Sequence, residues 1–110
     1  NLDNFMVIVD ENGFQAMGKT QDIIELGSIQ SKFESFGFDT IIVDGHDEIA
    51  INKAIEKLWN SGTKKPKVLI AKTVKGKGVD FMENDNSWHY TRLDKGSYQA
   101  AIMSVDGNDV

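Results

Sequence analysis

Three short runs of apolar, largely β-branched residues set the strongest limit on how this chain can fold. They are Phe5–Val9, Thr40–Val43 and Val68–Ala71. A strand that is buried on both faces, as in a parallel sheet, shows such a continuous run rather than an alternation of apolar and polar residues. We therefore predict three strands of one parallel sheet, each buried on both faces.

The segments between these runs carry the signals of helices. We predict that Ser28 caps a short helix ending at Gly37 and that Asp47 caps a longer one. Apolar residues at helical spacing should form one stripe on the longer helix. They are Ile51, Ala54, Ile55 and Leu58. This order of elements predicts the α/β class, a partly parallel sheet flanked by helices.

Further apolar residues complete the predicted fold. We expect Phe33, Phe36 and Phe38 to lie in the core, and a last helix over Tyr98–Val105. We treat residues 1–110 as a single domain with a frayed tail over 105–110. Because three strands form a thin sheet for such apolar runs, the sequence reads like a portion of a larger domain.

Composition excludes several classes of function. The 110 residues carry a formal net charge of -5, which argues against nucleic-acid binding because phosphate contacts require a basic face. No run approaches the roughly 20 apolar residues that a membrane-spanning helix requires. The chain has no cysteine, which fits a reducing compartment, and we expect a cytoplasmic protein.

Polar segments follow each predicted strand directly. These segments are Asp10–Phe14, Asp44–Asp47 and Lys72–Gly78. The carboxyl ends of parallel strands meet at one edge of the sheet, where open α/β folds bind their ligands. We therefore expect the first and last of these loops to meet over one ligand.

The first loop offers hard oxygen donors. Asp10, Asn12 and the carbonyl groups around Gly13 and Phe14 are ligands of the kind that magnesium prefers. The alternative is that Asp10 and Asn12 only shape a turn, as such residues commonly do. Their spacing alone leaves both interpretations open.

The last loop combines glycines with lysines. Gly76 and Gly78 permit a close approach of the main chain to a ligand, and the neighbouring Lys75 and Lys77 attract an anion. The loop lacks the G-x-G-x-x-G spacing of a dinucleotide site, so a solvated turn is the alternative.

Two histidines accompany these loops. His89 follows Trp88 and could carry a proton near neutral pH, although a packed or surface residue is the alternative. His46 lies at a predicted helix start, where we expect a local hydrogen-bonding role.

Taken together and in order, three segments resemble a known family. The segments NLDNFMVIVDENGFQAMGKT, VDGHD and KPKVLIAKTVKGKGVDFMENDNSWH look like the thiamine-diphosphate-binding domain of transketolase, especially its short form made as an N-terminal subunit. The resemblance runs from Asn1 to about Ala101. It implies that the chain is the C-terminal portion of such a domain.

The resemblance assigns roles to five residues. It implies that the side-chain oxygen of Asn12 and the backbone carbonyl of Phe14 bind magnesium or calcium. It places His89 near thiamine diphosphate, where it assists substrate or proton handling. Lys75 matches a lysine of the loop that closes over the active site, and Gly76 gives that loop its path.

The implied reaction transfers a two-carbon ketol unit from a ketose phosphate to an aldose phosphate. Its implied partners are the N-terminal half of the domain, with a Gly-Asp-Gly motif, and a pyrimidine-binding domain or C-terminal subunit, with an activating glutamate. The resemblance therefore also implies that the protein forms a homo- or hetero-oligomer. The alternatives are another thiamine-diphosphate enzyme of transketolase type and a non-catalytic α/β interaction domain.

Two features depart from the family pattern. Gly-Asp-Gly does not occur in the 110 residues, and Tyr90 stands where a glycine usually follows the Trp-His pair. The first departure removes the aspartate that anchors the metal. The second affects the backbone path beside His89.

We predict that the isolated 110 residues bind thiamine diphosphate and magnesium weakly or not at all, because Asn12 and one carbonyl are too few ligands for a hydrated magnesium ion. Isothermal titration calorimetry measures this directly. Micromolar affinity of the isolated chain would contradict the prediction.

Overall fold

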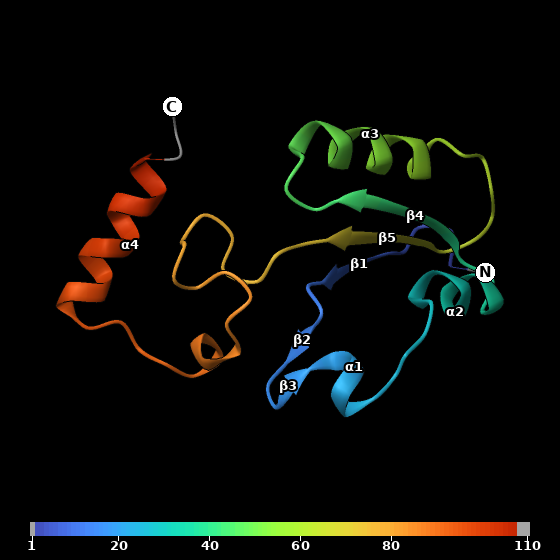
Figure 1. Ribbon diagram of the computed structural model, residues 1–110. Coiled ribbons are helices and arrows are strands. Elements are labelled where there is room, and N and C mark those ends of the chain that lie inside the picture. Colours follow the sequence, from blue (N-terminus) through green and yellow to red (C-terminus); the bar gives the residue numbers. More distant parts are fainter. Residues whose placement is uncertain (1, 108–110) are drawn as a thin grey trace. The chain divides into compact units, whose positions relative to one another are not determined.

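The computed structural model describes residues 2–107, which form two compact units (Figure 1). One unit comprises residues 2–12 and 25–73 and contains the three-stranded sheet. The other comprises residues 13–24 and 74–107 and contains a small hairpin, the glycine-lysine loop and the last helix. Each unit is described by itself below.

The sheet has the order β1-β5-β4, and both pairings are parallel. Its strands are β1 (Met6–Glu11), β5 (Lys67–Lys72) and β4 (Asp39–Asp44). In the register of the sheet Glu11 pairs with Lys72, and Lys72 pairs with Asp44, so the three strands end in line. The predicted α/β class and parallel sheet are confirmed.

Burial on both faces holds only for the central strand. Val68, Leu69 and Ile70 of β5 are at most 1% exposed. In contrast, Ile8 of β1 is 62% exposed and Ile42 of β4 is 42% exposed. The prediction of two-sided burial is therefore wrong for the outer strands, which have a neighbouring strand on one side only within the described residues.

The helices of this unit begin where the sequence predicts. The Ser28 hydroxyl accepts a hydrogen bond from the Ser31 N–H at 3.1 Å and caps α2 (Ile29–Ser35). The Asp47 carboxylate accepts one from the Ala50 N–H at 2.9 Å and caps α3 (Glu48–Trp59). The predicted stripe of α3 packs on β5: Ala54, Leu58 and Leu69 are buried together, with Ile51 and Ile55 against them.

The prediction that three phenylalanines lie in the core is wrong for Phe36, and Phe33 and Phe38 are only half-buried. Phe33 and Phe38 pack edge to face, with ring centroids 5.2 Å apart. Phe36, however, is 82% exposed. Helix α2 ends at Ser35, so Phe36 is the capping residue after the helix and does not lie on its apolar face.

The second unit contains short elements that the sequence does not reveal. Strands β2 (Phe14–Gln15) and β3 (Gly18–Lys19) form an antiparallel hairpin, followed by α1 (Thr20–Ile23). A 3₁₀ helix, η1 (Asn86–His89), precedes α4 (Lys95–Gly107). None of the helices within residues 2–107 is long and apolar enough to cross a membrane.

Helix α4 is longer than the predicted Tyr98–Val105. It begins at Lys95, where the Asp94 carboxylate accepts hydrogen bonds from the backbone and the side chain of Ser97. It includes residues 105–107 of the expected frayed tail, and residues 108–110 lie outside the described residues.

We predict that Thr40→Val raises the free energy of unfolding by about 1 kcal/mol. The Thr40 hydroxyl is buried without a hydrogen-bond partner among the described residues, and such a group costs roughly 1–3 kcal/mol. Urea denaturation measures the change. Thr63→Val is the control and should be destabilising, because the Thr63 hydroxyl donates to the Asp39 carboxylate. A lower stability of Thr40→Val would contradict the prediction.

Candidate functional site

The carboxyl ends of the strands are joined by hydrogen bonds, as the parallel topology predicts. The Thr73 hydroxyl donates to the Asp10 carboxylate, and the Thr73 N–H donates to the Glu11 carbonyl at 3.3 Å. The Gly45 N–H donates to the Lys72 carbonyl at 2.7 Å. These contacts draw the ends of β1, β4 and β5 together in one unit.

The glycine-lysine loop is folded tightly on itself. The Asn84 N–H donates to the Lys75 carbonyl at 2.9 Å, and the Val79 N–H donates to the Gly76 carbonyl at 3.1 Å. Gly76 has φ 75°, and a Cβ there would lie 2.5 Å from the Met82 carbonyl oxygen. A side chain at this position would collide with backbone, so the loop itself requires Gly76.

Ser104 of helix α4 contacts the far side of this loop. The Ser104 hydroxyl donates to the Gly78 carbonyl at 3.1 Å and accepts from the Asp80 N–H at 3.2 Å. Gly78 has φ 90°, and a Cβ there would meet nothing within 4 Å. Gly78 is therefore favoured by its backbone conformation alone. Gly76 is favoured both by its backbone conformation and because a side chain would not fit there.

The lysines of this region differ in their acidic neighbours. The Lys72 ammonium lies 2.6 Å from a carboxylate oxygen of Glu11, and the Lys77 ammonium lies 3.7 Å from one of Glu83. Within residues 2–107, Lys75 forms no ion pair. Lys75 thus differs from Lys72 and Lys77, whose charges each face a carboxylate.

A short helix anchored to the loop positions His89. The Asp85 carboxylate caps η1 by accepting from the Ser87 N–H at 2.9 Å. The Trp88 indole N–H donates to the Phe81 carbonyl at 3.1 Å, and the two aromatic rings pack edge to face. His89 closes this helix and is exposed, so its imidazole can reach a ligand in solvent.

Tyr90 causes no backbone strain beside His89. Its φ of -122° is open to any residue, so the glycine of the family pattern is not required in this conformation. The rings of His89 and Tyr90 pack edge to face, with centroids 4.7 Å apart and planes at 83°. Tyr90 is 75% exposed, which leaves most of its ring open to solvent.

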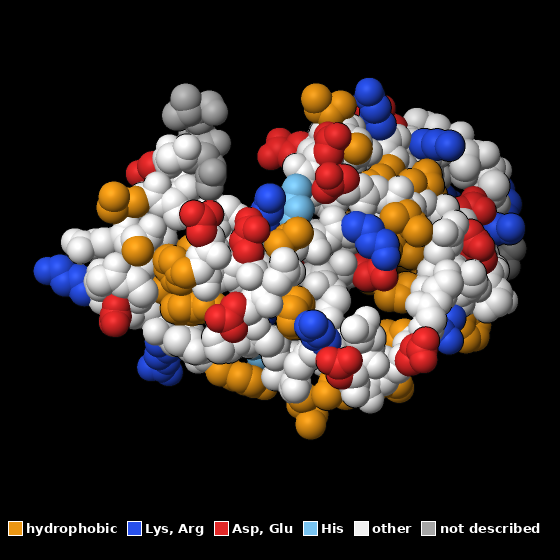
Figure 2. Space-filling model, in the orientation of Figure 1, with side chains coloured by type: hydrophobic (Ala, Val, Ile, Leu, Met, Phe, Trp, Pro, Cys, Tyr) orange, Lys and Arg blue, Asp and Glu red, His pale blue; other side chains and the backbone are white. Residues whose placement is uncertain are grey.

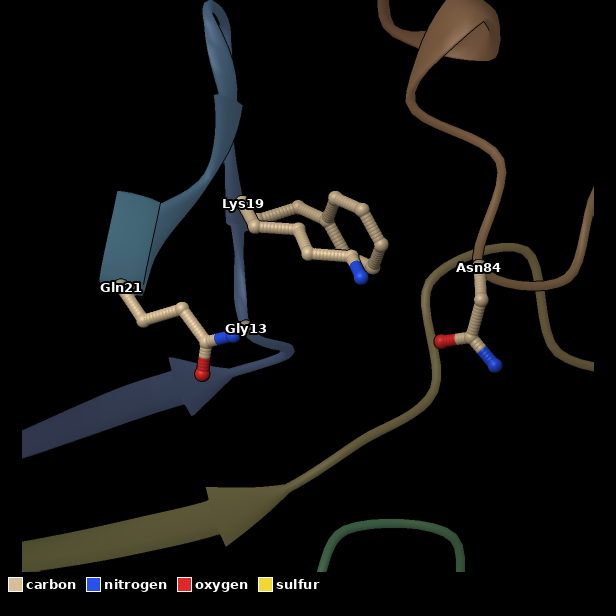
Figure 3. Close-up of a pocket in the computed structure, with 5 residues that line it drawn as sticks. Gly13, Lys19, Gln21 and Asn84 are labelled. Carbon is tan, nitrogen blue, oxygen red and sulfur yellow. The ribbon is translucent and has the colours of Figure 1, made fainter. Parts of the chain in front are cut away.

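A pocket of about 410 Å³ lies within the second unit (Figure 3). It is lined by Gly13, Phe14, Lys19, Gln21 and Asn84. The Lys19 and Asn84 side chains project into the space between the hairpin and the loop (Figure 3). Nitrogen donors beside an aromatic ring suit a polar or anionic ligand.

Sequence reasoning missed Lys19, Gln21 and Asn84 as pocket residues. Their pocket forms because residues 13–21 and the loop with Asn84 lie side by side, although they are far apart in the sequence. The Asn86 side-chain amide joins the two segments by donating to the Ala16 carbonyl at 3.4 Å. Among these three residues, only Asn84 has a local feature that could have indicated a turn. It has φ 55°, a conformation that asparagine tolerates better than most residues.

The structure assigns the predicted site residues to different units. Phe14, Lys75, Gly76 and His89 belong to the second unit, and Asn12 belongs to the first. Within residues 2–107, no group of three or more His, Cys, Asp or Glu side chains could hold a metal ion. The side-chain oxygen of Asn12 and the carbonyl of Phe14 have the right chemistry for magnesium, but they are only part of a six-oxygen shell.

Acidic and basic side chains are interspersed over the face shown in Figure 2. That face carries no continuous basic surface of the kind that nucleic-acid binding requires. The formal net charge of -5 agrees with this distribution.

Comparison with known proteins settles the family. The model of the family described as "Transketolase, thiamine diphosphate binding domain" matches residues 1–104. This chain belongs to the transketolase family. The predicted resemblance is thereby confirmed, and with it the thiamine diphosphate-binding domain as the type of domain.

Relatives and a solved structure extend this result. The chain is 33% identical to a subunit of the apulose-4-phosphate transketolase of Phocaeicola vulgatus, across 94% of this chain and 37% of that protein. It is 30% identical to the 6-deoxy-6-sulfo-D-fructose transketolase subunit SqwG of Clostridium sp., across 96% of this chain and 38% of that protein. Transketolase from Campylobacter jejuni matches with a TM-score of 0.84 and 30% identity, across 96% of this chain and 16% of that chain. The chain thus spans less than two fifths of the length of these transketolases.

We predict that the cap of η1 in this transketolase-family chain depends on pH. Hydrogen bonds from the Ser87 backbone and then from its hydroxyl hold the pKa of Asp85 below its ordinary value of 3.8. A lowered folded-state pKa means that the cap is fully present above about pH 3.8 and is lost as the pH falls through the folded value.

NMR titration of the Ser87 amide resonance tests this prediction. The midpoint should lie below 3.8 in the wild type. Asp85→Asn keeps an accepting oxygen but does not titrate, so its Ser87 amide should show no step there. A wild-type midpoint at or above 3.8 would rule out the proposed cap.

Proposed function

We propose that this chain contributes the lysine loop, the histidine and part of the metal ligands of a transketolase active site. The enzyme would transfer a two-carbon ketol unit from a ketose phosphate to an aldose phosphate, with thiamine diphosphate and a divalent metal. The family match over residues 1–104 carries this proposal. The lack of an ion pair at Lys75 within residues 2–107 supports it, because the cofactor and the proposed substrates are both anions.

The metal-side roles fall to Asn12 and Phe14. The amide oxygen of Asn12 and the main-chain carbonyl of Phe14 would each supply one hard ligand to magnesium or calcium. Neither residue carries a formal charge, so the remaining ligands must supply the negative charge that balances the ion. The cofactor diphosphate and an aspartate of the proposed Gly-Asp-Gly segment have that charge.

Lys75 and His89 would act on the anionic and reacting groups. Thiamine diphosphate, when bound, supplies the electron sink that a carbon–carbon bond cleavage beside a carbonyl requires. Lys75 would bind a phosphate oxygen of cofactor or substrate through its ammonium. His89 would orient a substrate oxygen and hold or release a proton at its imidazole nitrogen, supported by the rigid attachment of η1 to the loop. Gly76 would act by allowing the closed form of the loop.

The proposed partners are the chains that would supply the remaining residues of the active site. Two relatives are named as transketolase subunits, which supports assembly of this chain with a second, pyrimidine-binding subunit in a cytoplasmic oligomer. Their names also contain different sugars, apulose 4-phosphate and 6-deoxy-6-sulfo-D-fructose. We infer a phosphorylated or similarly anionic sugar as the substrate class of this chain.

The test compares two lysines of one loop in the assembled enzyme. Lys75→Met should raise the thiamine diphosphate or sugar phosphate concentration for half-maximal activity about 10- to 100-fold, the usual effect of losing a hydrogen bond to a charged group. Lys77→Met is the matched control and should stay within about 3-fold, because Lys77 already faces Glu83. Equal losses in the two variants, or none in Lys75→Met, would contradict the proposed role.

A further inference from the structure

Thr73 lies where the ends of all three strands meet. Its hydroxyl donates to the carboxylate of Asp10, the residue before the last of β1. Its N–H donates to the carbonyl of Glu11, which ends β1. Thr73 itself directly follows β5. A single residue therefore joins the ends of two neighbouring strands through both its backbone and its side chain.

The third strand reaches Thr73 through Gly45, which follows β4. The Gly45 N–H donates to the Lys72 carbonyl at 2.7 Å. A Cβ on Gly45 would collide with the Thr73 methyl carbon and would lie 3.0 Å from the Ala71 Cβ. Real Cβ atoms essentially never approach another atom as closely as the methyl carbon here, so only glycine leaves room for it. The half-buried Thr73 side chain thus contacts the Asp10 carboxylate and leaves no room for a side chain at Gly45.

An ion pair also lies at the ends of β1 and β5. Lys72 and Glu11 form an ion pair at 2.6 Å, with side chains 54% and 24% exposed. Exposed pairs of this kind are screened by solvent and stabilise little. They also lie on the opposite face of the sheet, because side chains alternate along β5. The Thr73 contacts therefore add a tie between these strand ends that does not depend on an exposed ion pair.

Two segments of the proposed site leave the sheet at these strand ends. Asn12 directly follows Glu11, and the loop with Lys75 begins directly after Thr73. We propose that Thr73, with Asp10 and Gly45, is a positioning residue for the cofactor site. It fixes the common starting point of the metal-side segment and the lysine loop. This inference rests on the proposed function.

The proposal also gives Asp10 a role. One of its carboxylate oxygens accepts from the Thr73 hydroxyl, so Asp10 holds the neighbouring strand end. It thereby acts on Asn12 indirectly, through the backbone of β1. Such supporting contacts to ligand-bearing segments typically change metal affinity or activity by about 10- to 100-fold when they are removed.

The experiment uses the assembled enzyme that contains this chain, with thiamine diphosphate and Mg²⁺ as probes. Thr73→Val keeps the shape and the methyl group but removes the hydroxyl, and Thr73→Ser restores the hydroxyl. We expect Thr73→Val to raise the cofactor concentration for half-maximal activity about 10-fold with kcat changed less. Thr73→Ser should stay within about 3-fold of the wild type. Thr40→Val, the same substitution on β4, is the matched control.

A second readout does not depend on catalysis. Hydrogen exchange followed by mass spectrometry should show faster exchange in residues 12–24 and 74–90 of Thr73→Val, and not in Thr40→Val. Gly45→Ala should reproduce this effect, because turning the Thr73 side chain away from the new methyl group moves its hydroxyl from Asp10.

The outcomes separate the two proposals. If the wild-type assembly binds no thiamine diphosphate while Thr73→Val still loosens both segments, the proposed function fails, whereas the fixing of both segments by Thr73 is supported. If the wild type binds the cofactor and Thr73→Val matches it in affinity and exchange, the positioning role is overturned. Equal losses in Thr73→Ser and Thr73→Val would also overturn it, since the hydroxyl would then not be the cause.

Discussion

Burial of β5 is the constraint on which the first unit depends. Its side chains from Lys67 to Ala71 are buried, and burying an aliphatic side chain contributes about 1.5–3 kcal/mol. Lys67 at the start of β5 is only 2% exposed, and its ammonium donates to the carbonyl groups of Asp3 and Lys65 at 2.9 and 2.8 Å. The buried strand β5 therefore gives β1 and β4 a well-packed partner. The end of β5 also determines where the following loop begins.

In the second unit, local contacts hold the segments that carry chemical groups. The loop after Thr73 is closed by its own backbone hydrogen bonds, and Gly76 packs against the Met82 backbone. Trp88 attaches η1 to Phe81 of the same loop. The backbone that carries Lys75 and His89 is therefore held by contacts within its own unit, and preorganisation of this kind reduces the entropy that a site loses on binding.

The sequence predicts the parts of this structure that arise from local patterns. Strand runs, helix caps at Ser28 and Asp47, and the α3 stripe follow from burial and capping rules that act over a few residues. The exposed Ile8 and Phe36 could not be predicted, because they depend on strand order and on where α2 ends. Prediction of the site is limited in the same way, because some of its residues come together only through the tertiary fold. Gly76 and Lys75 stand out as a motif, whereas Lys19 and Asn84 share a pocket only through the path of the chain.

The sheet order also determines when the first strand can form. Strands β4 and β5 are joined by α3 alone, so this βαβ unit can assemble from neighbouring sequence. Strand β1 pairs only with β5 among the described strands, although β4 and α3 lie between the two in the sequence. The β1–β5 pairing therefore forms only after β5 has been synthesised. Such long-range pairing is slow to form, and an apolar strand without its partner is prone to aggregation, so the β1–β5 pairing is the step of this sheet that depends most on the rest of the chain.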